Sequence, residues 1–203
     1  MRSRARAALV VLGLTVASCS SCGPPPATRT GPPPERFRDA LRGVSLDPPP
    51  APFARSDTGA ASSVVHFADP DTRAGLHVLA FPSAGASADL AAVEPRVQAY
   101  LRGLGESVAG LSVRAVRALL RFGLHGVEIE YEGGPEPRMM SIDWVLYAPG
   151  RVYVVKITAP RIRFGELSGP LVRARDSLHI TASQPDGRSL QPDGRSVEET
   201  QTH

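Results

Sequence analysis

The sequence predicts an α+β fold: a mainly antiparallel sheet covered by helices on both faces, which is an αβα sandwich. Three observations lead to this fold class. Strand-like runs follow one another with only short turns between them, which favours antiparallel pairing. Two segments have apolar residues every three or four positions, as amphipathic helices do. The run over residues 139–159 is apolar on both of its faces, which is typical of strands buried on both sides.

The first expected element is a hairpin over residues 64–81, in which two β-rich runs flank an Asp-Pro-Asp turn at 69–71. A helix is expected next, over 87–104, with Ser87 as its N-cap. Its apolar face consists of Leu90, Val93, Val97, Leu101 and Leu104. Pro95 lies off this face and should kink or restart the helix.

Residues 111–123 fit two kinds of structure. Val113, Val116 and Leu120 are spaced for one face of a helix. The alternative is one face of a strand, formed by Val116, Ala118, Leu120 and Phe122. We adopt the strand because of a family resemblance described below.

The run over residues 127–131 alternates strictly between apolar and acidic residues, which predicts a strand with one buried and one solvated side. Glu128, Glu130 and Glu132 would lie on the solvated side. They could be interpreted as a catalytic carboxylate array, but we interpret them as the solvent-facing residues of an alternating strand.

A second hairpin is expected over residues 139–159, with a Pro-Gly tip at 149–150. With this tip, the numbers of opposed residues sum to 299, so Asp143 falls opposite Lys156, the only lysine of the chain. A one-residue slip would set the aspartate against an apolar side chain. The pair is either a cross-strand ion pair worth about 0.2–1 kcal/mol or part of a polar pocket beneath a covering helix, where a ligand could bind.

The last expected element is a helix over residues 163–180, with Ser168 as N-cap and Pro170 in the first turn. Its apolar stripe is formed by Phe164, Leu167, Leu171, Ala174 and Leu178.

The stretch "GRVYVVKITAP…F…L…PL…ARDSLHI" is similar to the close of the PsbP/DcrB-like domains. In that family the last strand ends in a T-A-P-like turn, and a terminal helix carries a serine followed by an apolar residue. The preceding "GLHGVEIEY…PRMMSIDWVLY" also fits. The resemblance covers residues 115–180 well and 44–104 loosely. It implies an antiparallel sheet between helices, in secreted or lipid-anchored proteins that mostly bind or assemble, and no catalytic residue set comes with it.

The N-terminus has the features of a secretory signal. Arginines at positions 2, 4 and 6 precede an apolar run over 7–17, which is too short to span a bilayer. The sequence Val-Ala-Ser-Cys that ends at Cys19 resembles the bacterial lipobox. This resemblance implies cleavage before Cys19, a diacylglyceryl group on its sulfur and acylation of the new amine. An ordinary cleaved secretory signal is the alternative.

Cys22 follows Cys19 at the spacing of a redox pair or a metal half-site. A redox pair is favoured by a helix start that lowers a thiol pKa, but Gly-Pro-Pro-Pro follows here. A zinc site needs two further ligands, and the chain has no other cysteine. We therefore interpret Cys19 as a lipidation site and leave Cys22 as either a second acylation position or a free thiol.

These features divide the chain into a signal peptide (1–18), a lipidated cysteine with a Pro-rich tether (19–35), one α+β domain (36–183) and a disordered tail (184–203) with a tandem QPDGRS repeat. Removal of the three signal arginines changes the balance of 23 basic and 20 acidic residues to 20 and 20. This formally neutral remainder does not indicate a nucleic-acid partner.

Little in the sequence indicates catalysis. The stretch Gly-Glu-Ser-Val-Ala at 105–109 lacks the last glycine of a serine-hydrolase elbow. If Ala68 pairs with Gly75 in the first hairpin, His66 lies opposite His77, and two imidazoles could hold a transition metal. No carboxylate at a suitable spacing completes that site, so we expect no metal and no cofactor.

The expected function is therefore that of a membrane-anchored envelope lipoprotein acting as a non-enzymatic binding or assembly module. The alternative is an envelope hydrolase or metal-dependent enzyme with an unrecognised site. The expected partners are the lipid bilayer, through acylated Cys19, and an unknown envelope protein or small ligand. In a Gram-negative host, Ser20 after the cysteine implies the outer membrane, facing the periplasm.

Overall fold

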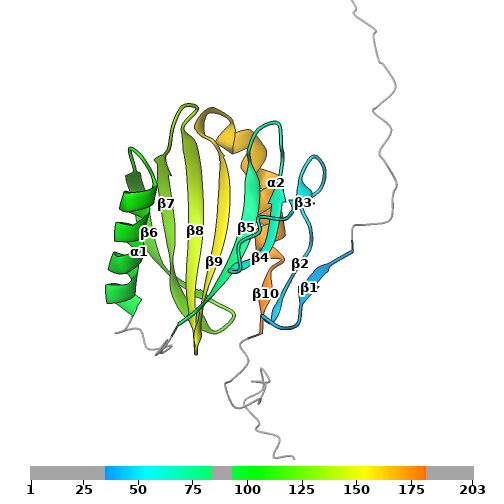
Figure 1. Ribbon diagram of the computed structural model, residues 1–203, viewed down its shortest axis with the longest axis vertical. Coiled ribbons are helices and arrows are strands. Elements are labelled where there is room, and N and C mark those ends of the chain that lie inside the picture. Colours follow the sequence, from blue (N-terminus) through cyan, green and yellow to red (C-terminus); the bar gives the residue numbers. More distant parts are fainter. Residues whose placement is uncertain (1–34, 84–92, 182–203) are drawn as a thin grey trace, which may run out of the picture. The chain divides into compact units, whose positions relative to one another are not determined.

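The computed structural model describes residues 35–83 and 93–181, within which ten strands form two antiparallel sheets (Figure 1). The strands are β1 (Phe37–Asp39), β2 (Val44–Leu46), β3 (Ala54–Ser56), β4 (Ser63–Ala68), β5 (Gly75–Pro82), β6 (Ser112–Arg121), β7 (Leu124–Gly133), β8 (Met139–Ala148), β9 (Arg151–Pro160) and β10 (His179–Ile180). The helical segments are α1 (Val93–Ser107), the 3-10 turn η2 (Arg161–Arg163) and α2 (Phe164–Asp176).

The large sheet has the strand order β3-β4-β5-β9-β8-β7-β6, and the small sheet has the order β1-β2-β10. All of the strand pairs are antiparallel. Three strands separate β5 from β6, so the chain crosses the sheet between them, and α1 lies in this crossover (Figure 1).

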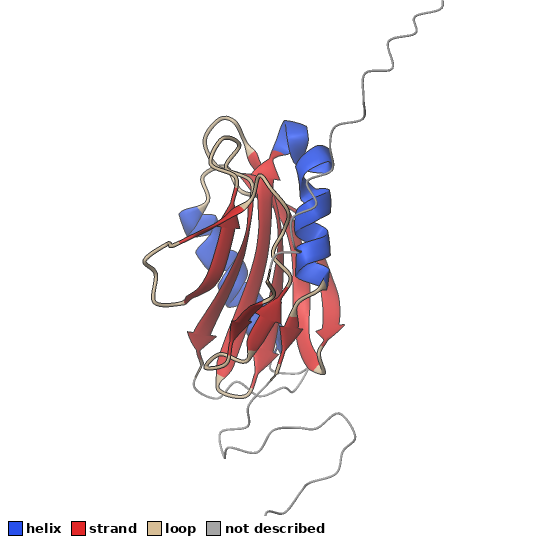
Figure 2. Ribbon diagram, turned by 90° about the vertical axis from the view of Figure 1, so that its right-hand side faces the viewer, coloured by secondary structure: helices blue, strands red, loops and turns tan. Residues whose placement is uncertain are grey.

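The large sheet carries helices on both of its faces, which confirms the predicted α+β fold class (Figure 2). We call the two sides the α1 face and the α2 face. On the α1 face, α1 packs against Val127, Ile129, Tyr131, Val145, Tyr147 and Val154. On the α2 face, α2 and the small sheet share a core with the side chains of Trp144, Leu146, Tyr153, Val155 and Ile157.

The predicted hairpin registers are both confirmed. In the second hairpin, Asp143 pairs with Lys156, and the tip is formed by Pro149 and Gly150. Gly150 has a φ of 70°, a left-handed conformation that glycine adopts without the steric cost of a Cβ atom. In the first hairpin, His66 pairs with His77.

The structure resolves the ambiguity at residues 111–123 in favour of the strand, since β6 covers Ser112–Arg121 at the edge of the large sheet. It confirms the helical face of α1 for Val93, Val97 and Leu104, which are buried. The proposed cap Ser87 lies outside the described residues.

The prediction for the start of the last helix is wrong. Ser168 does not cap it, because α2 begins at Phe164, directly after η2, and Arg163 occupies the N-cap position. Pro170 therefore lies inside the helix. The chain turns into the helix immediately after β9, so that Leu167 and Leu171 reach the α2-face core.

The prediction that Glu128, Glu130 and Glu132 are solvated is also wrong. The relative solvent exposure of their side chains is only 24%, 22% and 10%, respectively. These side chains lie on the α2 face, where arginine side chains cover them. Glu132, for example, has arginine nitrogens at 2.7 Å (Arg114) and 3.1 Å (Arg161). The alternation correctly predicts a strand, but ion pairs with arginine side chains shield the acidic side of this strand from solvent.

Candidate functional site

Polar side chains form a row across the α1 face, in register from strand to strand. Ser56 pairs with His66, His66 with His77, His77 with Lys156, and Lys156 with Asp143. We call these five residues the polar row. It runs through β3, β4, β5, β9 and β8, and α1 covers its β8 end.

Asp143 is completely buried at the covered end of the polar row. Its Oδ2 atom accepts hydrogen bonds from Tyr100 OH of α1 at 2.6 Å and from Tyr131 OH of β7 at 3.0 Å. Its Oδ1 atom is buried without a hydrogen-bond partner among the described residues. Burial raises the pKa of Asp143, although Lys156 and the two hydroxyl groups oppose the shift.

Lys156 is linked to Asp143 through a tyrosine hydroxyl. Its Nζ atom donates to Tyr131 OH at 2.7 Å, and that hydroxyl donates to Asp143. Lys156 and Asp143 are thus joined by a Lys–Tyr–Asp relay, and the direct ion pair expected from the register is not among the described contacts. Burial, followed by the nearby Asp143 carboxylate, raises the pKa of both Tyr100 and Tyr131, so both phenols remain protonated and able to donate.

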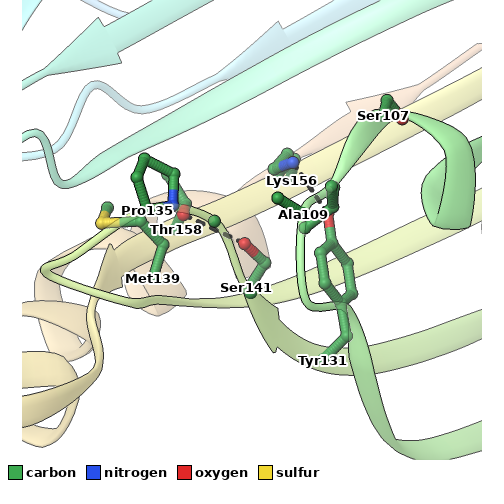
Figure 3. A pocket seen from close by; sticks show the side chains of 11 residues that line it. Ser107, Ala109, Tyr131, Pro135, Met139, Ser141, Lys156 and Thr158 are labelled. Atoms are coloured by element: carbon green, nitrogen blue, oxygen red, sulfur yellow. Dashed lines mark hydrogen bonds between the residues drawn. The ribbon is translucent and has the colours of Figure 1, made fainter.

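A pocket of about 360 Å³ opens on the α1 face beside this relay (Figure 3). Its wall includes Lys156, Tyr131 and two hydroxyl residues, Ser141 and Thr158, whose oxygens lie 3.0 Å apart. The rest of the wall is formed by Ser107, Val108, Ala109, Gly133, Gly134, Pro135 and Met139. Lys156 lines this pocket, whereas Asp143 is not among the described lining residues.

The two histidines of the polar row are side by side, with ring centroids 4.8 Å apart. Each ring has one nitrogen in a 2.9 Å hydrogen bond with a serine: His66 Nδ1 with Ser56 and His77 Nε2 with Ser63. Burial lowers the pKa of His66, and burial together with His66 and Lys156 lowers the pKa of His77 to about 4. Both imidazoles are therefore neutral near pH 7.

The histidine pair fits a metal poorly. Within the described residues, no group of three or more histidine, cysteine, aspartate or glutamate side chains is arranged to hold a metal ion. Two imidazoles, each already bonded to a hydroxyl, supply fewer ligands than transition-metal sites normally use.

Sequence reasoning paired Asp143 with Lys156 and His66 with His77, but it did not place the two pairs on one face, and it missed the two tyrosines. A partial signal for both was present. Tyr100 lies three residues after Val97 on the apolar face of α1, and Tyr131 ends the apolar side of the alternating run in β7. Neither position indicated a shared carboxylate, because Tyr100 and Asp143 are 43 residues apart in the chain.

A second cavity, of about 220 Å³, lies on the α2 face and is lined by Arg121, Phe122, Trp144 and Asp176. The indole of Trp144 is held firmly there. Its Nε1 atom donates to Glu128 at 2.9 Å, and the Arg175 guanidinium lies 4.0 Å from the ring centroid. In this cavity the Arg121 cation lies over the Trp144 ring and lines the wall together with the Asp176 carboxylate, whereas the described wall of the α1-face pocket has a lysine and no carboxylate.

Comparison with solved structures gives a match to the solution structure of cyanobacterial PsbP (CyanoP) from Synechocystis sp. PCC 6803. The TM-score is 0.55 at 15% sequence identity, and the alignment covers 77% of this chain and 98% of that chain. The domain has the PsbP-like fold. The sequence resemblance is thereby confirmed at the level of the fold.

Two further solved structures are more distant. PA94 from Pseudomonas aeruginosa, a protein of unknown function, has a TM-score of 0.46 at 16% identity, with 70% of this chain and 93% of that chain covered. LpqN, involved in cell envelope biogenesis of Mycobacterium tuberculosis, has a TM-score of 0.47 at 12% identity, with 68% and 82% covered. No protein-family model matches the sequence, and no curated protein matches it.

The relay in this PsbP-like domain predicts energetic coupling between its ends. Asp143→Ala and Lys156→Ala should each lower the free energy of unfolding, and the double variant should lose less than the two losses combined. The difference should be of the order of 0.5–3 kcal/mol, as for residues that share one hydrogen-bond network. Urea unfolding of the four proteins measures it. Lys156→Ala combined with Arg38→Ala, on the small sheet, is the control and should be additive; strict additivity for Asp143 and Lys156 would contradict the relay.

The lowered pKa of His77 predicts a pH-dependent stability. The unfolded histidine takes up its proton near pH 6.5 and the folded one near pH 4. The unfolded state therefore binds more protons between these values, and the stability from His77 is present above pH 6.5 and lost as the pH falls towards 4. Thermal unfolding measured from pH 7 to pH 4 should show a shallower loss in His77→Gln than in wild type.

The matched control for this pH series is His179→Gln, since His179 is an exposed histidine outside the polar row. An identical slope in wild type and His77→Gln would show that burial of His77 does not affect protonation.

Proposed function

We propose that this protein is a membrane-anchored lipoprotein of the cell envelope whose PsbP-like domain acts as a non-enzymatic binding module. The α1-face pocket is the observation that supports a binding function. Its volume of about 360 Å³ lies within the range of small-molecule sites, and it combines an apolar wall with a few convergent polar groups. Fold alone does not assign a function, and the pocket is the feature that points to binding.

Anchoring through Cys19 is supported by the sequence that precedes it, which resembles a lipobox and ends a signal-like apolar run. A thioether-linked diacylglyceryl group plus an acylated amine would give stable attachment, because a single acyl chain binds membranes only marginally. Within the described residues, α1 and α2 are not long and apolar enough to cross a membrane. In a Gram-negative host, we expect the protein at the outer membrane, facing the periplasm.

The arrangement in the pocket favours binding over hydrolysis. A serine nucleophile needs a base within hydrogen-bond reach. The Ser141 hydroxyl instead has Thr158 as its hydrogen-bond partner, and the Lys156 amine donates to Tyr131. The relay groups are therefore arranged to hold one another and to offer donors, which suits recognition of a ligand.

The lipid anchor is tested with Cys19→Ala. This variant should either accumulate unprocessed or leave the membrane fraction, because it lacks the sulfur that accepts the diacylglyceryl group. Cell fractionation and incorporation of radiolabelled palmitate measure the two effects, and Ser21→Ala serves as the matched control. A processed wild-type protein found entirely in the soluble fraction would overturn the anchor.

The proposed binding function is tested by looking for a ligand that co-purifies with the protein. The full chain, purified without added ligand, should carry a bound small molecule that native mass spectrometry detects. Ala109→Trp should lose it, because Ala109 is an exposed residue of the pocket wall and a large ring there would obstruct the cavity. The control is Ala115→Trp, on the edge strand β6. Turnover of ester substrates that depends on Ser141 would support the hydrolase alternative instead.

A further inference from the structure

We infer that the α1-face pocket takes a small organic anion, a carboxylate with a short apolar part, whose charged end contacts Lys156. This inference rests on the proposed function, because it names the ligand class of the proposed binding module. It is drawn from three features of the pocket: its charge, its free hydrogen-bond donors and its apolar end.

The charge of the pocket wall has one sign. Lys156 is the only charged residue among those that line it. The nearest carboxylate in register, Asp143, is completely buried and lies behind the wall, where its Oδ2 atom already accepts from two tyrosine hydroxyls. The neighbouring His77 is neutral at pH 7 because its pKa is about 4. Among the described residues, a ligand in the pocket therefore meets one ammonium group and no acidic side chain.

The Lys156 ammonium group has N–H donors that no described contact uses. A protonated lysine has three N–H donors, and the described contacts of Lys156 Nζ use one of them, on Tyr131 OH at 2.7 Å. Ser141 and Thr158, on the same wall, hydrogen-bond to each other at 3.0 Å, and Thr158 Oγ1 also donates to the Met140 carbonyl at 3.4 Å. Figure 3 shows the Lys156 amine and this hydroxyl pair among the side chains that line the pocket. The two remaining N–H donors of Lys156 match the acceptor oxygens of a carboxylate better than a second cation or an apolar group.

The remaining wall is apolar and sets the size of the ligand. It includes Val108, Pro135 and Met139. Gly133 keeps this part of the wall closely packed, because a Cβ atom there would lie 2.6 Å from Val108 Cγ1. At the roughly 30 Å³ that a water molecule occupies in the liquid, the pocket would hold about a dozen non-hydrogen atoms. A carboxylate with a chain of about six carbons fits this space.

The test compares three probes of equal chain length: hexanoate, the neutral hexanamide and the cationic hexylamine. Binding is measured by isothermal titration calorimetry on the processed full-length chain in lipid nanodiscs, with empty nanodiscs subtracted. Hexanoate should bind at least tenfold more tightly than hexanamide, and hexylamine should not bind measurably. Lys156→Met, which keeps an unbranched side chain but removes the charge, should abolish the preference for hexanoate.

The matched control is Arg38→Met, which removes one positive charge from an exposed residue of the small sheet and should leave the preference unchanged. Ala109→Trp provides a second readout, because it leaves Lys156 in place and should weaken hexanoate at least fivefold. If Lys156→Met fails to fold, this second variant decides.

Equal binding of hexanoate and hexanamide to wild type would overturn the inference, as would a preference that survives Lys156→Met or a hexanoate affinity unchanged in Ala109→Trp. Absence of binding by every probe would overturn it too. A neutral or cationic molecule found by native mass spectrometry in the wild-type pocket would overturn the ligand class and leave the binding module standing. An empty wild-type protein that binds no probe would count against both.

Discussion

The register of the β8–β9 hairpin is the constraint on which the rest of the domain depends. Side chains alternate across a sheet with a period of two, so the turn at Pro149 and Gly150 decides for both central strands which residues face each helix. In this register Asp143 and Lys156 face α1, while Trp144 and its neighbours fill the α2-face core. A slip of one residue in β8 would move the Asp143 carboxylate into that apolar core, where an unpaired charge is very costly.

Burial of Asp143 on the α1 face then places further requirements on the chain. A buried carboxylate is tolerated when hydrogen bonds satisfy it, and here the donors come from α1 (Tyr100) and β7 (Tyr131). The Asp143 side chain thus connects α1, the β8–β9 hairpin and strand β7 through hydrogen bonds. Because Tyr131 also accepts from Lys156, the same network holds the lysine at the wall of the pocket. The buried Asp143, which stabilises the packing of α1 on the sheet, and Lys156, the candidate ligand-binding group, therefore belong to one polar cluster.

The anchor and the site are encoded in separate parts of the chain. Attachment is proposed at Cys19, which precedes the described domain in the sequence, whereas recognition is proposed at Lys156, in the centre of the sheet. The PsbP-like fold itself supplies a sheet with two covered faces and does not specify a ligand. In this domain the polar row lies on one face of the sheet and brings Lys156 to a pocket.

The sequence by itself determined the two central hairpins with their registers, the two helical stripes and hence a sheet between helices. Each of these follows from local periodicity and turn residues, which act over two to four positions. Tertiary structure alone decided that Tyr100 would reach Asp143, 43 positions away, and that arginines would cover Glu128 and its neighbours. It also decided where α2 begins and which two- and three-residue strands form the small sheet. Strands that short have no periodicity to read, and contacts between distant elements depend on how those elements pack, which no local pattern encodes.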